Sequence, residues 1–436
     1  MIDLMDRGCA EQPDAHPRSA HSGAGWGNGQ SPLRVCHLGK FYPPAAGGIE
    51  SHLQTLAQAQ ARLGMMVDVL CVNHRDRRGA DVTWRAFART RTVREQEGQV
   101  RLLRLGRHAS LARLDCCLGL PRRLWRLSPD HYDLLHVHVP NPTMVLGLIL
   151  CRPRVPWVIS YHSDVIRQKA LLLLQRPFEN WVFRRARAIF AASPPYLAGS
   201  SYLQRFADKV AINPYGIDLA AFVHPSAAAR QAAERFRAAY GQPLWLAIGR
   251  LVYYKGLANA VRALTQVPGR LMVVGDGPLR GELQRQAQAA GLAHRIEWHA
   301  GLSRDELIGA YLAATALWFP SNARSEAFGI VQIEAMACGT PVINTAIPGS
   351  GVAWVSRDGE SGLTVPVDDW KALAQAANRL SCDAKLRERL SARARQRAIQ
   401  EFDAERMAQR TQQVYRHALT RVEALEPSVR APHPRR

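Results

Sequence analysis

The segment from Phe319 to Pro341, with the apolar runs at its two ends, constrains the fold of this chain more than any other stretch. Residues 316–319 are apolar and predict a buried strand, which Pro320 breaks into a polar loop. From Phe328 onward, apolar residues recur at spacings of three and four, and Gly339 ends this helical period. A second apolar strand follows. This order of strand, loop, helix and strand is typical of α/β proteins.

The start of this helix is a candidate anion site. The first backbone N–H groups of a helix lack intrahelical acceptors, and the helix dipole adds positive potential there. Two carboxylates flank the position, because Glu326 precedes the helix and Glu334 lies about two turns inside it. Carboxylates accept hydrogen bonds from sugar hydroxyls, so the pair suits a hydroxyl-rich ligand beside a diphosphate. Spacing alone leaves open an ordinary dipole carboxylate and a solvated helix residue.

Strand-like apolar runs alternate with helical segments along most of the chain. The runs of the first half cover residues 33–38, 66–72, 100–105, 133–139, 155–162, 188–192 and 210–213. After Pro214–Asp218 the pattern restarts, with runs at 244–248, 270–274, 296–300, 316–319, 342–344 and 363–365. This alternation predicts an α/β fold of two Rossmann-like domains, whose doubly wound parallel sheets face a central cleft.

The predicted organisation has five parts. Residues 1–31 form a disordered N-terminal extension, 32–214 an N-terminal Rossmann-like domain and 215–400 a C-terminal Rossmann-like domain; 401–424 form a helix that can return to the N-terminal domain, and 425–436 a disordered tail. Within the first domain, residues 73–98 are charged and predict an irregular segment.

Length, charge and cysteines restrict the class of protein. The 436 residues suffice for two full cores, and a formal net charge of +21, mostly from arginine, favours anionic partners such as phospholipid headgroups, nucleotide diphosphates or nucleic acid. The eight cysteines form no CxxC pair, which favours reduced thiols in a cytoplasmic protein. We see no secretory signal, and the longest apolar run, Met144–Leu150, is too short to span a bilayer.

The central segment resembles a known family signature. Ser325–Gly329, the seven residues between Glu326 and Glu334, and the run from Glu334 to Pro341 are together similar to the nucleotide-sugar signature of retaining GT-B glycosyltransferases, family GT4 or glycosyl transferases group 1. The resemblance covers residues 33 to about 415. It implies the GT-B fold, with an N-terminal acceptor domain, a C-terminal donor domain, a nucleotide-diphosphate sugar as donor and no cofactor.

Two cations follow the first strand of the second half, in the run Gly249–Gly256. Negative charge builds on the diphosphate as the sugar leaves it, so fixed cations stabilise the transition state more than the ground state. Arg250 can bind phosphate oxygens in a bidentate way, whereas Lys255, one of few lysines, acts as a point charge. The pair is similar to the family's Arg-x4-Lys-Gly element. The alternative is two surface cations in a very basic chain.

The resemblance implies further donor-binding positions. Glu326 would hold hydroxyls of the donor sugar, and Glu334 the ribose. Gly275 and Gly277 belong to a Gly-Asp-Gly-Pro loop, which either contacts the nucleotide or makes a tight strand-to-helix connection. The remaining predicted donor-binding residues are Gly48, Ser321, Phe328, Gly329, Ile330 and Val331.

A histidine ends one strand of the first half, where ligands gather in doubly wound sheets. The run His162–Lys169 resembles the family's active-site histidine segment, which implies that His162 lies near the transferred sugar, although a lone strand-end histidine is more often structural. Asp164 and His138 are acceptor-side candidates, and His138 also fits a structural role beside His136 on one strand face. No Asp-x-Asp motif or cluster with metal-ligand spacing predicts a metal site, so Arg250, Lys255 and the helix start would replace a divalent cation.

The predicted function follows from the resemblance. It implies a retaining hexosyltransferase with front-side attack by the acceptor hydroxyl. The run 162–169 most resembles bacterial mannosyl- and rhamnosyltransferases of surface-polysaccharide synthesis, so we expect a GDP-sugar donor, GDP-mannose first, and a lipid-linked or polysaccharide acceptor. Ala327 departs from the commoner Glu-Gly-Phe-Gly form and leaves the sugar open. A GT-B UDP-sugar epimerase and a basic nucleic-acid-binding protein are the alternatives.

Basic and apolar residues mix in two segments of the first half, 121–126 and 168–176, and residues 184–187 add further charge. Such segments suit a peripheral protein on the inner face of the cytoplasmic membrane, whose acceptor lies in an anionic leaflet. Core helices with solvated arginines fit the same pattern.

Overall fold

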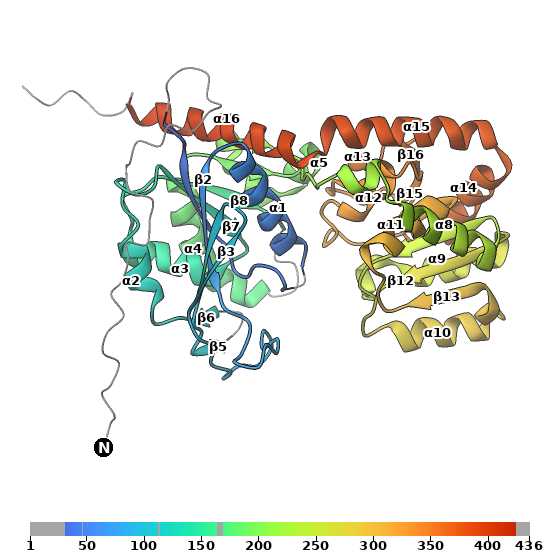
Figure 1. The fold of residues 1–436 in the computed structure, drawn as a ribbon, viewed down its shortest axis with the longest axis horizontal. Coiled ribbons are helices and arrows are strands. Elements are labelled where there is room, and N and C mark those ends of the chain that lie inside the picture. The colour runs from blue at the N-terminus through green and yellow to red at the C-terminus, as the bar shows by residue number, and fades with distance from the viewer. Residues whose placement is uncertain (1–30, 46, 112–113, 164–168, 424–436) are drawn as a thin grey trace, which may run out of the picture.

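A computed structural model describes residues 31–45, 47–111, 114–163 and 169–423, which form two α/β bodies (Figure 1). The N-terminal body contains an eight-stranded sheet in the order β10-β9-β8-β7-β1-β2-β4-β3. Its strands are β1 (Arg34–Leu38), β2 (Met66–Val72), β3 (Val93–Glu97), β4 (Val100–Leu105), β7 (Leu134–Val139), β8 (Trp157–Tyr161), β9 (Ile189–Ala191) and β10 (Val210–Ile212).

The edge of this sheet differs from the prediction. Strand β3 pairs with β4 in an antiparallel register, Val93 opposite Arg104, although residues 73–98 predicted an irregular segment. The side chains of β3 are mostly exposed and polar, so the strand carries no apolar run that a sequence pattern could detect. A short antiparallel pair, β5 (Ala109–Leu111) and β6 (Leu114–Cys116), escaped prediction for the same reason.

The C-terminal body contains a six-stranded, all-parallel sheet in the order β13-β12-β11-β14-β15-β16. Its strands are β11 (Leu244–Ile248), β12 (Arg270–Val274), β13 (Ile296–His299), β14 (Ala316–Phe319), β15 (Val342–Thr345) and β16 (Gly362–Val365). The chain order reverses between β11 and β14, and ligands of such sheets bind beyond the carboxyl ends of the strands at this point. The loops after β11, β12 and β14, together with helix α12 (Ile330–Ala337), hold all the predicted donor residues except Gly48, which begins α1 (Gly48–Arg62).

Helices cover both sheets. In the N-terminal body they are α1 (Gly48–Arg62), α2 (Leu120–Trp125), α3 (Pro142–Cys151), α4 (Lys169–Arg185), α5 (Pro194–Gly199) and α6 (Ser201–Gln204). The C-terminal body carries α7 (Ala220–Val223), α8 (Ala227–Tyr240), α9 (Leu257–Ala263), α10 (Arg280–Ala289), α11 (Arg304–Ala313), α12 (Ile330–Ala337), α13 (Val352–Val355), α14 (Trp370–Cys382) and α15 (Ala384–Glu401). Among the described helices, α3, α5, α6, α8, α11, α14 and α15 begin at side-chain caps, whereas α1 and α12 begin after a glycine without one.

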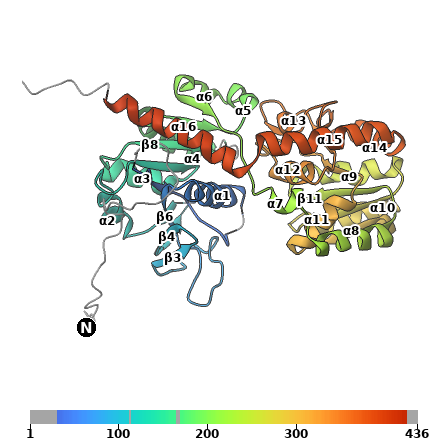
Figure 2. The same ribbon diagram turned by 45° about the horizontal axis from the view of Figure 1, so that its top comes forward.

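The last described helix, α16 (Ala404–Glu423), crosses between the bodies. Figures 1 and 2 show α15 along the C-terminal body and α16 along the N-terminal body. Tyr415 of α16 is buried in the same apolar cluster as Leu53 of α1. The linker is tied to the break between the two helices, because Ile217 donates to Phe402 O and accepts from the Ala404 amide.

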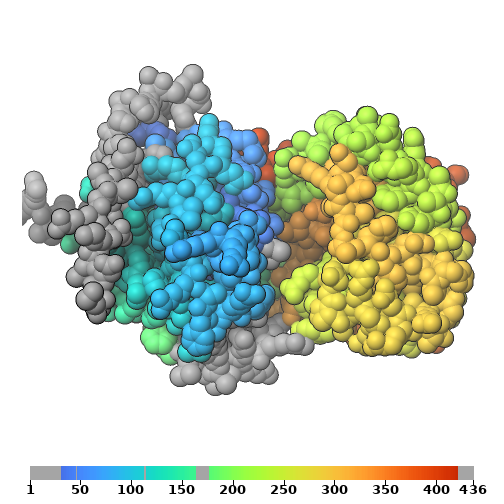
Figure 3. All heavy atoms as spheres, turned by 60° about the horizontal axis from the view of Figure 1, so that its bottom comes forward, coloured from blue at the N-terminus to red at the C-terminus, as the bar shows by residue number. Residues whose placement is uncertain are grey.

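The two bodies also meet through side chains beside the linker. The ring of Tyr215 packs on Phe328, with centroids 4.9 Å apart, and Arg324 donates to the carbonyl of Tyr196 in the N-terminal body. Figure 3 shows a groove between the blue and yellow-green bodies, with orange atoms of the C-terminal half at its floor. Among the described residues, no helix is both long enough and apolar enough to cross a lipid bilayer.

Candidate active site

Two glycine loops form one edge of the site. The loop after β11 and the loop after β12 bond to each other, since Gly249 donates to Val274 O and Leu251 donates to Asp276 O. A Cβ on Gly277 would lie 2.6 Å from Leu251 O, and Gly275 has a φ of +139°. Both positions therefore require glycine for backbone packing, which supports the tight-connection interpretation of the Gly-Asp-Gly-Pro loop.

The structure brings Lys255 and Glu326 together. Lys255 Nζ lies 2.5 Å from Glu326 Oε2, and their side chains are 14% and 12% exposed. Lys255 ends a 3-10 turn after β11, while Glu326 lies in the loop between β14 and α12. The ammonium group also lies over the ring of Phe319, 4.9 Å from its centroid. A cation and a carboxylate thus meet at the carboxyl end of the sheet, where each restrains the other.

Arg250 lies on the same loop as Lys255, but its side chain is exposed. It makes no ion pair or side-chain hydrogen bond with the described residues, so its guanidinium group is available to an anion. Lys255 and Arg250 therefore differ, because the protein positions the first and leaves the second unconstrained.

The start of α12 combines open amides with buried side chains. Gly329 precedes the helix with a φ of +82°, and Ile330 and Val331 begin it without a side-chain cap. Phe328 is a core residue, because its ring packs against Tyr215, Trp354 and Phe402. Its side chain cannot face a ligand, so only the backbone of this segment can. Ser321 is also fully buried, and its hydroxyl has no hydrogen-bond partner among the described residues.

Glu334 lies one and a half turns into α12. Its carboxylate accepts a 2.6 Å hydrogen bond from the hydroxyl of Tyr311 on α11. Burial raises the pKa of Glu334, and the Tyr311 bond opposes that rise. The carboxylate for which the resemblance implies a contact with the ribose is thus hydrogen-bonded to Tyr311 in this structure.

The N-terminal body contributes Gly48 and His162. Gly48 is the exposed first residue of α1, and a Cβ there would meet no atom of the described residues within 4 Å. His162 follows β8 and is buried; its Nδ1 lies 2.8 Å from the Tyr215 hydroxyl, and its Nε2 lies 3.0 Å from His138 Nδ1. Asp164 lies outside the described residues.

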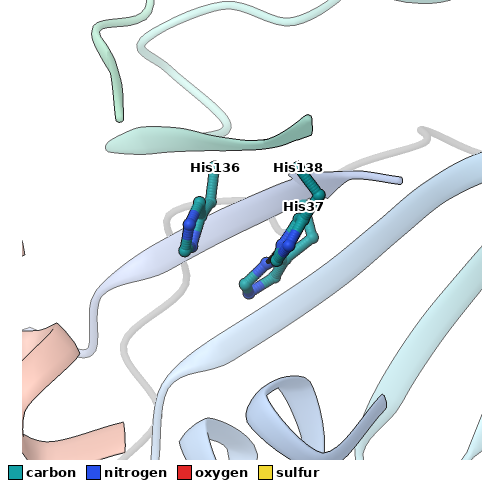
Figure 4. A group of neighbouring side chains, drawn as sticks. All are labelled: His37, His136 and His138. Carbon is teal, nitrogen blue, oxygen red and sulfur yellow. Dashed lines mark hydrogen bonds between the residues drawn. The ribbon is translucent and has the colours of Figure 1, made fainter. Parts of the chain in front are cut away.

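His162 lies in a row of buried histidines, whose other members come from β7, β1 and α1. His138 Nε2 lies 3.0 Å from His37 Nδ1, and His136 lies on the same face of β7 (Figure 4). His52 of α1 packs against Tyr215, with ring centroids 4.5 Å apart. Burial lowers the pKa of every histidine in this row, to about 4 for His37 and about 3 for His162. At neutral pH the row is uncharged.

Sequence patterns missed most of this row. His136 and His138 alternate along one strand, and that alternation is the signal that predicted a shared face. The sequence did not indicate that His37 lies on the adjacent strand and His52 on the covering helix. Ring nitrogens of His37, His136 and His138, and those of His52, His138 and His162, lie within 4.8 Å of one another. The expectation of no metal stays a prediction.

A pocket of about 780 Å³ lies elsewhere, at the opposite edge of the C-terminal sheet. Its lining includes Thr315 and Pro341, which precede β14 and β15, together with Arg387 and Arg395 of α15. Ligands of open α/β sheets gather at the carboxyl ends of the strands, so we assign no donor to this amino-end pocket.

Comparison with solved structures identifies the fold as GT-B. Sucrose-phosphate synthase from Thermosynechococcus elongatus is 26% identical and superposes with a TM-score of 0.70 over 89% of this chain and 100% of that chain. Anabaena HepE in complex with UDP has a TM-score of 0.67 at 19% identity, over 88% of this chain and 100% of that chain, which supports the fold alone. The predicted architecture is therefore confirmed.

Comparison of sequences identifies the family. The Glycosyltransferase Family 4 model matches residues 46–221, and the Glycosyl transferases group 1 model matches residues 230–397. O-antigen chain mannosyltransferase C of Escherichia coli is 30% identical over 86% of this chain and 96% of its own length. D-rhamnosyltransferase WbpZ of Pseudomonas aeruginosa is 36% identical over 56% of this chain and 63% of its own length. The chain belongs to this glycosyltransferase family, which implies a nucleotide-sugar donor and a glycan acceptor.

Proposed function

We propose that this enzyme transfers a hexose from a GDP-sugar, with GDP-mannose as the first candidate, to a lipid-linked or polysaccharide acceptor with retention of anomeric configuration. The ion pair between Lys255 and Glu326, beside the uncapped start of α12, carries the proposal. It brings a cation suited to a diphosphate and a carboxylate suited to sugar hydroxyls to one point.

Charge development in the reaction gives these groups their roles. As the bond between the sugar and the diphosphate breaks, negative charge grows on the leaving phosphate, where Lys255, Arg250 and the α12 amides can stabilise it. The acceptor hydroxyl attacks from the side on which the phosphate leaves and passes its proton to a phosphate oxygen. Glu326 accepts hydrogen bonds from the sugar, and Glu334 binds the ribose after Tyr311 releases it. No protein nucleophile takes part.

The relatives support the choice of donor and pathway. The name of the Escherichia coli relative describes a mannosyltransferase of O-antigen chains, and that of the Pseudomonas aeruginosa relative describes a D-rhamnosyltransferase. We therefore propose a role in the synthesis of a cell-surface glycan. Ala327 stands where the commoner form of the motif has glycine, and its methyl group can narrow the sugar site.

A panel of nucleotide sugars tests the donor. Calorimetry should show tighter binding of GDP-mannose than of UDP-glucose or UDP-N-acetylglucosamine, and Lys255→Ala should weaken it. Tighter binding of a UDP-sugar would overturn the donor assignment. Conversion of a UDP-sugar without any acceptor would favour the epimerase, and salt-sensitive DNA binding without sugar-nucleotide binding would favour the nucleic-acid alternative.

Attachment to an anionic membrane is a separate part of the proposal. Trp84 and Phe87 lie in one loop of the N-terminal body and are 83% and 87% exposed. The fully buried guanidinium group of Arg107 holds this loop, since it donates to the carbonyls of Val82, Arg85 and Ala88. A loop built around a buried cation, which exposes two aromatic side chains, suits the interface of a bilayer.

Charge supports the same surface. Arg85, Arg89 and Arg91 on this loop are exposed, and exposed arginines near a bilayer favour anionic lipids. In the segment 121–126, Trp125 is also exposed, whereas Leu124 is buried in the core. The side chains of residues 168–175 lie outside the described residues. The loop that contains Trp84 and Phe87 therefore becomes the main candidate for membrane contact.

Vesicle flotation tests this part. Wild-type protein should float with vesicles that contain phosphatidylglycerol and remain in solution with phosphatidylcholine alone. The double variant Trp84→Ser, Phe87→Ser should lose most of its binding, whereas Ile399→Ser, which removes an exposed apolar side chain from α15, should not. Equal flotation of the double variant and the wild type would exclude this loop.

A further inference from the structure

The buried histidines belong to a continuous hydrogen-bonded chain that starts at the domain linker. Its first links join the Tyr215 hydroxyl to His162 Nδ1 (2.8 Å), His162 Nε2 to His138 Nδ1 (3.0 Å) and His138 Nε2 to His37 Nδ1 (3.0 Å). His37 Nε2 then lies 2.7 Å from Gln60 Oε1. Each ring therefore uses both of its nitrogens within the chain.

The hydrogen-bonded chain continues beyond Gln60 to the last described helix, α16. Gln60 Nε2 donates to the Tyr415 hydroxyl over 3.0 Å, and that hydroxyl lies 2.5 Å from His136 Nδ1. His136 Nε2 lies 2.7 Å from Ser160 Oγ. Residues of α1 and α16 are thus connected to the domain linker through the interior of the N-terminal body.

Gln60 is the group that gives this chain a direction. A neutral imidazole has one donor and one acceptor nitrogen, and a hydroxyl can do both, so neither type sets a direction. An amide has a distinct acceptor oxygen and a distinct donor nitrogen. Because Gln60 Oε1 faces His37, the Nε2 of His37 must carry the proton and its Nδ1 must accept.

The same rule then applies to each following ring. His138 Nε2 donates to His37, so His138 Nδ1 accepts from His162 Nε2. His162 Nδ1 is left as an acceptor, and the Tyr215 hydroxyl donates a hydrogen bond to it. Reversal of one ring would place two lone pairs or two protons in one link, which is costly in a buried site. Burial keeps the rings neutral, since it lowers their pKa values.

We propose that Gln60 is a positioning residue, which acts through His37 and His138 to hold His162 in the tautomer whose Nδ1 accepts a hydrogen bond from a ligand hydroxyl group. The inference rests on the proposed function for the identity of that hydroxyl, a donor-sugar hydroxyl that replaces Tyr215. Tyr415 holds the other end of this amide, because its hydroxyl accepts a hydrogen bond from Gln60 Nε2.

Nitrogen NMR of histidine-labelled protein tests the inference without any turnover. In the wild type, His162 should show a protonated Nε2 and an unprotonated Nδ1, with the signal assigned by its loss in His162→Asn. Gln60→Leu should mix the two tautomers of His162, and Tyr415→Phe should do so to a smaller extent. The control Gln58→Leu removes another glutamine of α1, one that bonds Glu97, and should leave His162 unchanged.

Two outcomes would overturn the inference. One is a protonated Nδ1 on His162 in the wild type, and the other is an unchanged tautomer in a folded Gln60→Leu protein. Kinetics add a second measurement, since Gln60→Leu should lower kcat/KM for the donor about tenfold, while Gln58→Leu should leave it within twofold. Failure of the donor assignment would change the best substrate and leave the NMR result intact, so the two failures are distinguishable.

Discussion

The two bodies present different polar chemistry near the groove between them. The C-terminal body offers charge, in the ion pair of Lys255 with Glu326 and in the exposed Arg250. The N-terminal body offers buried neutral rings, in which His162 and His138 are joined by hydrogen bonds. This difference is consistent with the proposed function, because charge suits a diphosphate and a neutral acceptor suits a hydroxyl group.

The largest expected effect comes from removal of the positive charge of Lys255 in the C-terminal body. Lys255→Ala should lower kcat by about 10²- to 10³-fold, the usual loss when one preorganised group that stabilises transition-state charge is deleted. Steady-state transfer assays measure it. Arg270→Ala, which breaks the half-exposed pair with Glu297 in the same body, is the matched control. Similar losses in both variants would indicate general damage and remove the distinction between the two bodies.

Acid should destabilise the N-terminal body, because its buried histidines are neutral in the folded state. Burial lowers the folded-state pKa values of His37 to about 4 and of His162 to about 3, below the ordinary value of 6.5. The unfolded chain therefore binds more protons below pH 6.5, and stability is full above that pH and falls as the pH approaches 4. Each such histidine contributes up to about 1.4 kcal/mol per pH unit. Urea unfolding at pH 7.5, 6 and 5 measures the slope, and a flat profile would contradict the neutral row.

Substitution of Gly329 tests whether the backbone conformation before α12 requires glycine. Its φ is +82°, and a Cβ would lie 2.8 Å from the ring of Phe319, so Gly329→Ala should cost about 1–3 kcal/mol of unfolding free energy. Gly281→Ala is the control, because a Cβ there meets only the far end of Arg285 at 3.6 Å. Equal stability of the two variants in urea would show that the start of α12 tolerates an ordinary residue.

The smallest effect is expected at Glu334. Glu334→Gln keeps a hydrogen-bond acceptor for Tyr311 but removes the charge, so the KM for the nucleotide sugar should rise about tenfold with little change in kcat. Tyr311→Phe should leave KM the same or lower, since it frees the carboxylate. A fall in kcat with KM unchanged in Glu334→Gln would place this residue at the transferred sugar rather than at the ribose.

Several elements could be predicted from the sequence, and others could not. The strand before Pro320 and the helix after Phe328 follow from apolar periodicity, and the structure confirms both, although α12 begins two residues later, at Ile330. The exposed strand β3 carries no apolar pattern, so its antiparallel pairing escaped prediction. Donor binding by Phe328 stays a prediction for its backbone alone, since its ring is in the core and position in a motif does not determine where a side chain points.

The sequence by itself determined the family and the two-sheet architecture, and it predicted that Arg250, Lys255 and Glu326 follow strands, because these features depend on periodicity and on residues close together in the chain. Only the tertiary structure decided that Lys255 contacts Glu326 across 71 residues, and that Gln60, His37, His138 and Tyr415 form one hydrogen-bonded chain. The physical reason is that strand register and helix packing set which distant polar atoms meet, and a local pattern contains no information about either.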